Sequence, residues 1–237
     1  GLPKYRYDLY RSHWNPSEKT IHLLPHWTWT GREGEVTPVY CYTNYPTAEL
    51  FVNGKSQGKI TKNTSVKTGS GKDGKISDIN DPALDRYRLR WNNVKYEPGE
   101  IKVVVYDENG NEAGTETMMT AGKAEHITLT GDLGAAIKPL TADGKSMTFI
   151  TVNIEDKDGN RCPDADNQIT VSVTGAANFK GICNGDATSI EVFTKPVMKA
   201  FHGQLVIGIQ SNGKAGNATV KVSGKGLKPA ATNVIVK

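Results

Sequence analysis

The chain has 237 residues, of which 37% are hydrophobic, and it contains 25 glycines and 11 prolines. Its formal net charge is +4, from 29 basic and 25 acidic residues scattered along the sequence. Such a mild, unclustered excess argues against a nucleic-acid partner, because phosphate backbones are bound by concentrated basic surfaces. The sequence has no apolar run long enough to span a bilayer, so we expect no membrane partner. Short apolar runs among many glycines and prolines predict short strands joined by turns.

Residues 2–14 carry the helical pattern of this chain. Leu2, Tyr5 and Leu9 approximate helical spacing, and Pro3 suits the first turn of a helix. A single amphipathic helix has no second helix to pack on. It either docks on the strands that follow or ends a domain that lies upstream, and we assign residues 1–21 to this helix and a linker.

The most informative stretch is the run HLLPHWTWTGREGE, residues 22–35. Trp27 and Trp29 are two residues apart, so an extended backbone would project both indoles to the same side. Indole faces stack on the CH-rich faces of sugar rings, and the neighbouring His26 and Arg32 could hydrogen-bond hydroxyls. The alternative is structural: a proline-bounded loop whose tryptophans fill the junction between two modules. The residue types alone leave both interpretations open.

From about Glu35 the apolar residues recur at every second position, which is typical of half-buried strands. The predicted strands of a first sandwich lie in residues 36–44, 48–60, 87–94 and 100–119. Asn53-Gly54 and Asn109-Gly110 predict hairpins with type I′ turns, in which both central residues have positive φ. Residues 61–82 are polar and rich in Gly, Ser and Lys, so we expect an exposed, mobile loop there.

A second series of strands begins near Glu125, and we place the domain boundary just before it. The first sandwich then covers residues 22–122 and the second covers residues 123–237. The strands predicted in the second lie in residues 125–129, 146–160, 167–175, 177–185, 201–216, 217–226 and 232–237. Their spacing is that of a seven-stranded immunoglobulin-like sandwich. The predicted fold class is all-β, with two consecutive immunoglobulin- or fibronectin-like sandwiches after a short N-terminal helix.

Candidate metal and catalytic motifs fail on their spacing. The run DKDGN at 156–160 resembles the start of a calcium loop, but Arg161 and Asn167 stand where the EF-hand pattern requires Gly and Glu. We interpret it as a hairpin turn, and a looser calcium site shared with Asp164 and Asp166 stays open. Residues 107–111, DENGN, repeat this turn pattern in the first unit.

Hydrolysis of a glycosidic bond needs two carboxylates that face each other across a cleft. Glu33 and Glu35 flank Gly34 on one loop, so they cannot lie on opposite sides of a sugar. We therefore predict no catalytic residues, no metal and no cofactor in this chain. Three cysteines stand at Cys41, Cys162 and Cys183. Buried free thiols are favoured, and a Cys162–Cys183 pair stays open.

Several longer motifs resemble a known family. The runs PKYRYDLYRSHWN, IHLLPHWTWTGREGE and ELFVNGKSQGK resemble the region after the catalytic barrel in bacterial glycoside hydrolase family 2 enzymes of the β-galactosidase type. The first of these runs is similar to the last helix of that barrel. The runs CNGDATSIEVF and KAFHGQLVIGIQS are similar to parts of the family's immunoglobulin-like C-terminal domain.

This resemblance implies a C-terminal accessory region whose partner is the catalytic barrel of the same polypeptide. The two catalytic glutamates of the family belong to the barrel, so the isolated chain is expected to be inactive. The resemblance also implies a galactoside or polysaccharide substrate for the parent protein and an extracytoplasmic location.

Three roles follow as hypotheses. In the first, Trp27, Trp29, His26 and Arg32 extend the rim of the barrel's sugar site. In the second, the chain is an autonomous carbohydrate-binding module. In the third, the sandwiches are structural spacers or oligomerisation domains, and this is the preferred interpretation for the second sandwich.

Overall fold

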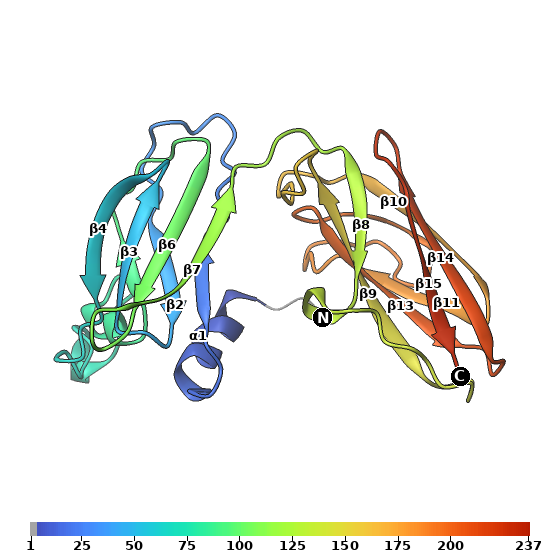
Figure 1. Cartoon of the computed structure of the whole chain (residues 1–237), viewed down its shortest axis with the longest axis horizontal. Helices are drawn as coiled ribbons and strands as arrows, with labels where there is room; N and C mark the ends of the chain where they lie inside the picture. Colours follow the sequence, from blue (N-terminus) through green and yellow to red (C-terminus); the bar gives the residue numbers. More distant parts are fainter. Residues whose placement is uncertain (1–3) are drawn as a thin grey trace. The chain divides into compact units, whose positions relative to one another are not determined.

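The computed structural model describes residues 4–237, which divide into two units with separate cores (Figure 1). The first unit ends at Thr120 and the second begins at Ala121. Every ladder between the strands of each unit is antiparallel. The predicted all-β fold class is confirmed. None of the described helices is both long and apolar enough to cross a bilayer.

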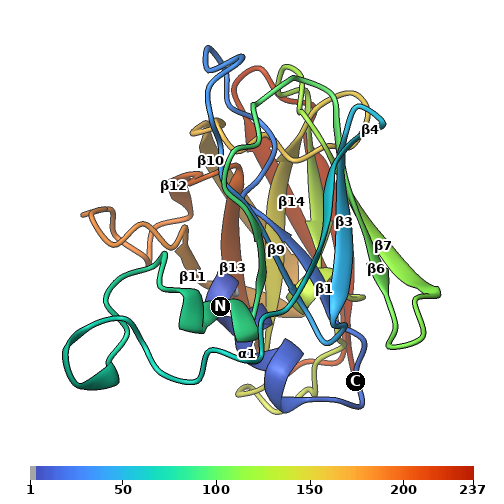
Figure 2. The same ribbon diagram turned by 90° about the vertical axis from the view of Figure 1, so that its left-hand side faces the viewer.

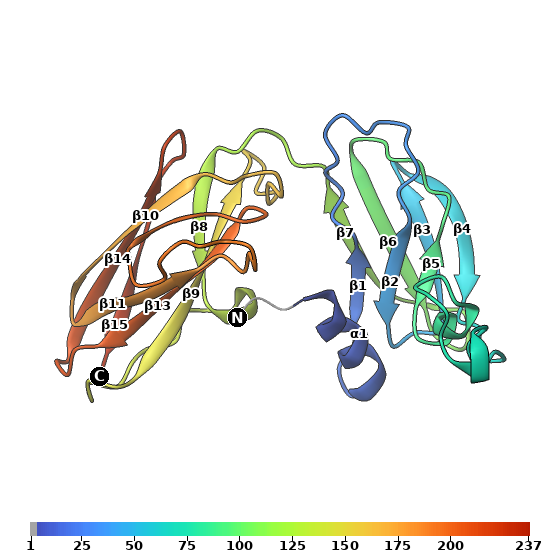
Figure 3. The same cartoon turned by 180° about the vertical axis from the view of Figure 1, so that it is seen from behind.

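The first unit pairs a three-stranded sheet with a four-stranded sheet, seen from behind in Figure 3. The smaller sheet has the order β1 (Ile21–Leu24), β2 (Val39–Thr43), β5 (Leu89–Trp91). The larger has the order β4 (Lys55–Thr61), β3 (Thr47–Val52), β6 (Glu100–Tyr106), β7 (Glu112–Met119). Strand β1 was not predicted, because Ile21 was assigned to the linker and the other three residues lie in the run 22–35, which was not interpreted as a strand.

Alternation along β3 and β6 builds the core of the first unit. In β3 the buried positions are Ala48, Leu50 and Val52, and the residues between them are half-buried. Side chains of successive strand residues point to opposite faces, so this pattern directs one face of the sheet inward. The core contains these buried residues: Leu23, Trp27, Val39, Cys41, Ala48, Leu50, Val52, Leu89, Trp91, Val94, Tyr96, Ile101, Val103 and Val105.

The polar segment between β4 and β5 is a long exposed loop, as predicted (Figure 2). The loop nevertheless has local structure, because it contains the 3-10 helices η1 (Lys72–Gly74) and η2 (Pro82–Arg86). Asp81 is buried and accepts backbone hydrogen bonds from Ser70, Ser77 and Ala83. These bonds, led by the one from Ser77, hold the pKa of Asp81 well below its usual value.

The second unit is a sandwich of two four-stranded sheets. One has the order β12 (Val197–Lys199), β10 (Gln168–Gly175), β14 (Gly216–Gly224), β15 (Ala230–Val236). The other has the order β11 (Ala177–Cys183), β13 (Gln204–Ser211), β9 (Met147–Glu155), β8 (His126–Thr130). A 3-10 helix, η3 (Asp132–Gly134), follows β8. The described part of this unit has eight strands rather than the predicted seven, because the three-residue edge strand β12 has too few residues to show a pattern.

The two predicted hairpin turns have different geometries. Asn53 and Gly54 have φ of 48° and 76°, which confirms the type I′ turn between β3 and β4. At the other turn Gly110 has a φ of 83° but Asn109 does not have a positive φ, so the predicted type I′ turn is wrong there. Asp107 explains the difference, because its carboxylate accepts the backbone N–H groups of Asn109 and Asn111 and so stabilises a longer turn.

The predicted helix is present as α1 (Tyr5–Trp14), which lies beside β1 and β2. An ordinary amphipathic helix buries apolar side chains, whereas the buried residues of α1 are Asp8 and Ser12. Asp8 lies 3.0 Å from the Arg11 guanidinium and 3.6 Å from Nε2 of His22 on β1. The aromatic residues of α1 are exposed: Tyr5 at 43%, Tyr7 at 45%, Tyr10 at 47% and Trp14 at 71%. Leu2, part of the predicted pattern, lies outside the described residues.

All three cysteines are free thiols, so Cys162 and Cys183 do not pair. Cys41 and Cys162 are buried, as predicted. Cys183 is exposed, and the prediction of a buried thiol is wrong for it. The alternation of β11 explains this, since the neighbouring Ile182 occupies the inward-facing position.

Candidate functional site

The segment that sequence analysis singled out is the Trp loop, defined as Pro25–Glu35, which follows β1. The backbone of Gly34 donates to the carbonyl of Tyr96 at 2.8 Å, and the Tyr96 N–H donates to the carbonyl of Glu35 at 2.9 Å. The Thr120 hydroxyl donates to the carbonyl of Trp27 at 2.6 Å. The Trp loop is therefore fixed to the segment before β6 and to the end of β7.

Trp27 belongs to the core of the first unit, where only 1% of its surface is exposed. Its ring meets that of Tyr96 edge-on at 5.2 Å, and its Nε1–H donates to the carbonyl of Glu97 at 3.0 Å. A side chain enclosed in this way has no face to offer a sugar. Trp27 fits the structural interpretation, with the difference that it fills a core within one unit.

Trp29, His26 and Arg32 form a cluster on the partly exposed side of the Trp loop. The rings of Trp29 and His26 stack at 4.2 Å with an interplanar angle of 25°. The Arg32 guanidinium carbon lies 5.0 Å from the centre of the Trp29 ring, within cation–π range. Three of the four residues predicted to contact sugar are thus brought together.

Hydrogen bonds orient the polar members of this cluster. The backbone N–H of Thr28 donates to Nδ1 of His26 at 3.3 Å, so Nε2 carries the proton when the ring is neutral. The Nε of Arg32 donates to Glu35 at 2.8 Å. The cluster therefore combines stacked aromatic rings with N–H donors, which is the chemistry of binding rather than of bond cleavage.

The two carboxylates of the Trp loop form hydrogen bonds within the loop. Glu33 accepts from the backbone N–H of Gly31 at 3.3 Å, and Glu35 accepts from Arg32. Because both lie on one loop within two residues of each other, they do not face each other across a cleft as the two carboxylates of a glycosidase must.

A polar cluster between α1, β1 and β7, in which Asp8 is buried and Glu116 and His22 are half-buried, was not predicted. Glu116 on β7 accepts the backbone N–H of Leu23 at 2.7 Å. Burial raises the pKa of Glu116 to about 7, with a further raising effect from Asp8. Burial also lowers the pKa of His22, despite the opposing effect of Asp8. The run EAGTETMM gives no sign of a half-buried carboxylate, because Leu23, whose N–H this carboxylate accepts, lies 93 positions away on β1.

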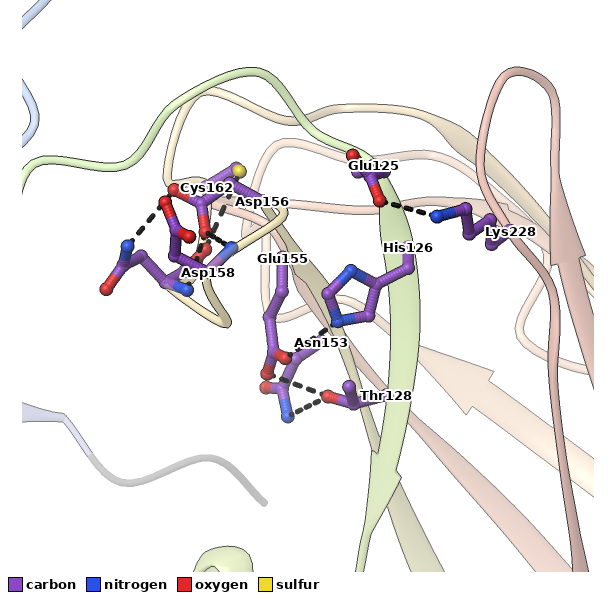
Figure 4. A network of polar contacts seen from close by, with 10 residues as sticks. Glu125, His126, Thr128, Asn153, Glu155, Asp156, Asp158, Cys162 and Lys228 are labelled. Atoms are coloured by element: carbon purple, nitrogen blue, oxygen red, sulfur yellow. Dashed lines mark hydrogen bonds and ion pairs between the residues drawn. The ribbon is translucent and has the colours of Figure 1, made fainter.

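The DKDGN run is a hairpin turn held by its first residue, and Figure 4 shows it beside the His126–Glu155 pair. The buried Asp156 carboxylate accepts backbone N–H groups from Gly122, Asp158 and Asn160 at 2.7, 2.9 and 2.8 Å. Burial alone would raise the pKa of Asp156, but these bonds outweigh it and hold the pKa at about 2. Within residues 4–237, no group of three or more His, Cys, Asp or Glu side chains could hold a metal ion.

A second polar row lies on β8 and β9 of the second unit (Figure 4). His126 Nε2 lies 3.5 Å from Glu155, and Thr128 donates to Glu155 at 2.7 Å. Asn153 donates to Thr128 at 3.4 Å. These residues pair across two adjacent strands, so their hydrogen bonds reinforce the sheet.

The chain thus consists of two antiparallel β-sandwich units, the first of which carries the aromatic–cationic cluster. Residues 132–233 match the model of the glycoside hydrolase family 2 C-terminal domain 5. Residues 34–114 match that of a domain of unknown function, DUF4982. The chain therefore belongs to glycoside hydrolase family 2, as part of the C-terminal region of proteins of that family.

Relatives of known name share this region. The chain is 38% identical over 235 residues to the β-galactosidase BoGH2A of Bacteroides ovatus, covering 99% of the chain and 24% of that protein. It is 26% identical over 180 residues to a β-glucuronidase of Formosa agariphila, covering 76% of the chain and 16% of that protein. The crystal structure of a β-glycosidase from Bacteroides vulgatus is 29% identical with a TM-score of 0.80, covering 99% of the chain and 27% of that structure. The chain thus spans a quarter or less of the curated relatives it matches.

Proposed function

We propose that this chain is a non-catalytic accessory region of a β-galactosidase-like glycoside hydrolase. In this proposal it packs against the catalytic barrel of the same polypeptide and extends the rim of the sugar-binding site. The observation that carries the proposal is the burial pattern of α1, which buries an aspartate and a serine and leaves Tyr7, Tyr10 and Trp14 exposed.

The aromatic side of α1, defined by Tyr10 and Trp14, has the properties of a packing surface. Tyr10 and Trp14 stack with ring centres 4.6 Å apart and planes only 6° from parallel, and Trp14 is the most exposed of the large side chains on α1. Large aromatic side chains contribute strongly to interfaces, so a run of them on one helix favours a protein partner. The catalytic barrel is the proposed occupant, because the chain covers only 24% of the β-galactosidase it resembles most among the relatives described above.

The cluster of Trp29, His26 and Arg32 is the proposed sugar contact. It lies on the loop that follows β1, the strand beside α1, and it combines a flat ring with N–H donors. Stacking against the indole would orient a galactoside or its aglycone, and the donors would bind hydroxyl groups. Such contacts change which substrate binds, while the reacting groups belong to the barrel.

The test uses the full-length protein with Trp29→Ala and, as the conservative control, Trp29→Phe. Loss of a stacking contact worth about 0.5–1.5 kcal/mol should raise KM for an aryl β-galactoside by about 2–13-fold, with a smaller effect on kcat. Trp29→Phe should retain most of the wild-type KM. A KM unchanged by Trp29→Ala would contradict the rim role, and strong turnover by residues 1–237 alone would contradict the non-catalytic one.

A further inference from the structure

We infer that the second unit has a binding site of its own for a neutral sugar, in a hollow beside the turn that joins β12 to β13. The hollow has a volume of about 440 Å³, within the range of small-ligand sites. Its lining combines one aromatic ring with carboxylate, amide and hydroxyl groups. The lining residues used below are Asp166, Asn184, Asp186, Thr188, Glu191 and Phe201. This inference does not depend on the role proposed for the Trp loop.

The amide at the base of the hollow is held rigidly. Asn184 is 5% exposed, its Nδ2 donates to the carbonyl of Lys199 at 3.0 Å, and its Oδ1 accepts the N–H of Asp186 at 3.0 Å. Asn184 therefore connects the loop after β11 to the end of β12 and sets the shape of the hollow before any ligand arrives.

Two carboxylates on this loop are oriented by hydrogen bonds. One oxygen of Asp186 accepts the N–H and the hydroxyl of Thr188, at 2.8 and 2.7 Å. Glu191 accepts the backbone N–H of Lys199 at 3.1 Å. An ionised carboxylate can accept about four hydrogen bonds, so both keep the capacity to accept sugar hydroxyls. Acceptors fixed in advance lower the entropic cost of binding.

The aromatic ring is supported by an unusual turn. Phe201 and Gln204 exchange backbone hydrogen bonds at 3.0 and 3.1 Å around His202 and Gly203, whose φ values are 51° and 70°. Asn-Gly is the favoured pair for a turn with two positive φ values. The histidine instead places its ring 4.1 Å from that of Phe201, which is 38% exposed at the hollow. His202 thus acts as a positioning residue for the aromatic surface.

The charged residues that line the hollow determine which class of ligand it can bind. Asp166, Asp186 and Glu191 outnumber the single cation, Lys199, among the lining residues, so anionic sugars and phosphates are repelled. The carboxylates do not converge into a metal-holding group within the described residues. Fixed acceptors beside an exposed ring fit a neutral hexopyranoside, whose hydroxyls donate and whose CH face packs on the ring.

The experiment titrates the 237-residue chain with methyl β-galactoside and methyl β-glucoside and follows backbone amide signals by NMR. At least one should shift the signals of Asn184, Thr188 and Phe201 with a Kd of about 1–10 mM. Phe201→Ala should weaken binding about 2–13-fold. Phe193→Ala, at an exposed phenylalanine on the loop between β11 and β12 that does not line the hollow, should leave the Kd unchanged.

The His202→Asn variant tests the role of the histidine ring in binding separately from its role in folding. Asparagine suits the turn, so the melting temperature should be equal or higher, whereas the Kd should rise because Phe201 loses its support. Shifts at the hollow with glucuronate or Ca²⁺ but with neither neutral sugar would overturn the inference. So would no shifts at all, or an unchanged Kd in a folded Phe201→Ala variant.

Discussion

Trp27 and Trp29 are two residues apart but have different surroundings. Trp27 fills the core and donates a hydrogen bond there, whereas Trp29 is half-buried and stacks on His26. Trp27→Ala should reduce the free energy of unfolding by about 3–5 kcal/mol, since it creates a large cavity. Trp29→Ala should cost less than about 1.5 kcal/mol. Urea unfolding of both variants measures the difference, and equal losses would contradict the assignment.

The two-residue spacing of the tryptophans predicted that both indoles project to the same side of the backbone. In the structure one is buried and the other is half-buried. Alternation holds only on an extended backbone, and residues 25–31 are outside any strand. Residue types thus predicted three members of the Trp29 cluster but could not tell core from surface at Trp27. The Tyr96 and Glu97 contacts that bury Trp27 are about 70 residues away in the sequence.

Glu116 should make stability depend on pH. Its pKa is about 7 in the folded chain against an ordinary 4.5, so folding favours the protonated form. This contribution is fully present below about pH 4.5 and is lost as the pH rises through about 7. Glu116→Gln keeps an acceptor for the Leu23 N–H, and at pH 8 it should be about 1–3 kcal/mol more stable than the parent.

Urea unfolding at pH 5 and pH 8 checks this, with Glu112→Gln, an exposed position on the same strand, as the control. The lowered pKa of His22 gives the opposite slope, because its contribution is lost as the pH falls below its ordinary 6.5. Removing the Glu116 titration should expose that slope. Identical pH profiles for the two glutamine variants would rule out a raised pKa at Glu116.

At the scale of elements, period-two patterning predicted most strands, and turn residues predicted where many of them end. The failures have identifiable physical causes. Strand β1 is followed at once by Pro25 and overlaps the aromatic-rich run 22–35, and β12 has only three residues. The helix α1 was predicted, but its buried side was not, because packing on β1 and β2 uses an aspartate rather than apolar side chains.

The two D-x-x-G-N turns are a matched pair of elements. Asp156 is buried and also accepts from Gly122, whereas Asp107 accepts only within its own turn. Asp156→Ala should lower the unfolding free energy of the second unit by about 2–4 kcal/mol, and Asp107→Ala should lower that of the first by about 1 kcal/mol. Hydrogen exchange of β9 and β6 in urea reports on each unit separately. An equal or larger loss for Asp107→Ala would contradict this ranking.

At the scale of the whole molecule, the two units share a fold class but differ in what they present to other molecules. The first has an aromatic helix side and the cluster of the Trp loop, and the second has the acidic hollow around Phe201. Neither the exposed aromatic side chains of α1 nor the hollow could be predicted from local patterns. Both depend on which side chains remain exposed once the sandwiches have formed, and only the three-dimensional structure contains that information.

The central claim is that the aromatic side of α1 is covered by the rest of a glycoside hydrolase. Oxidative footprinting of residues 1–237 alone and of the full-length protein measures this directly, because it reports the solvent exposure of individual side chains. The account predicts that Tyr10 and Trp14 are readily oxidised in the isolated chain and strongly protected in the full-length protein, with core Trp27 protected in both. Equal oxidation of Tyr10 and Trp14 in the two proteins would contradict it.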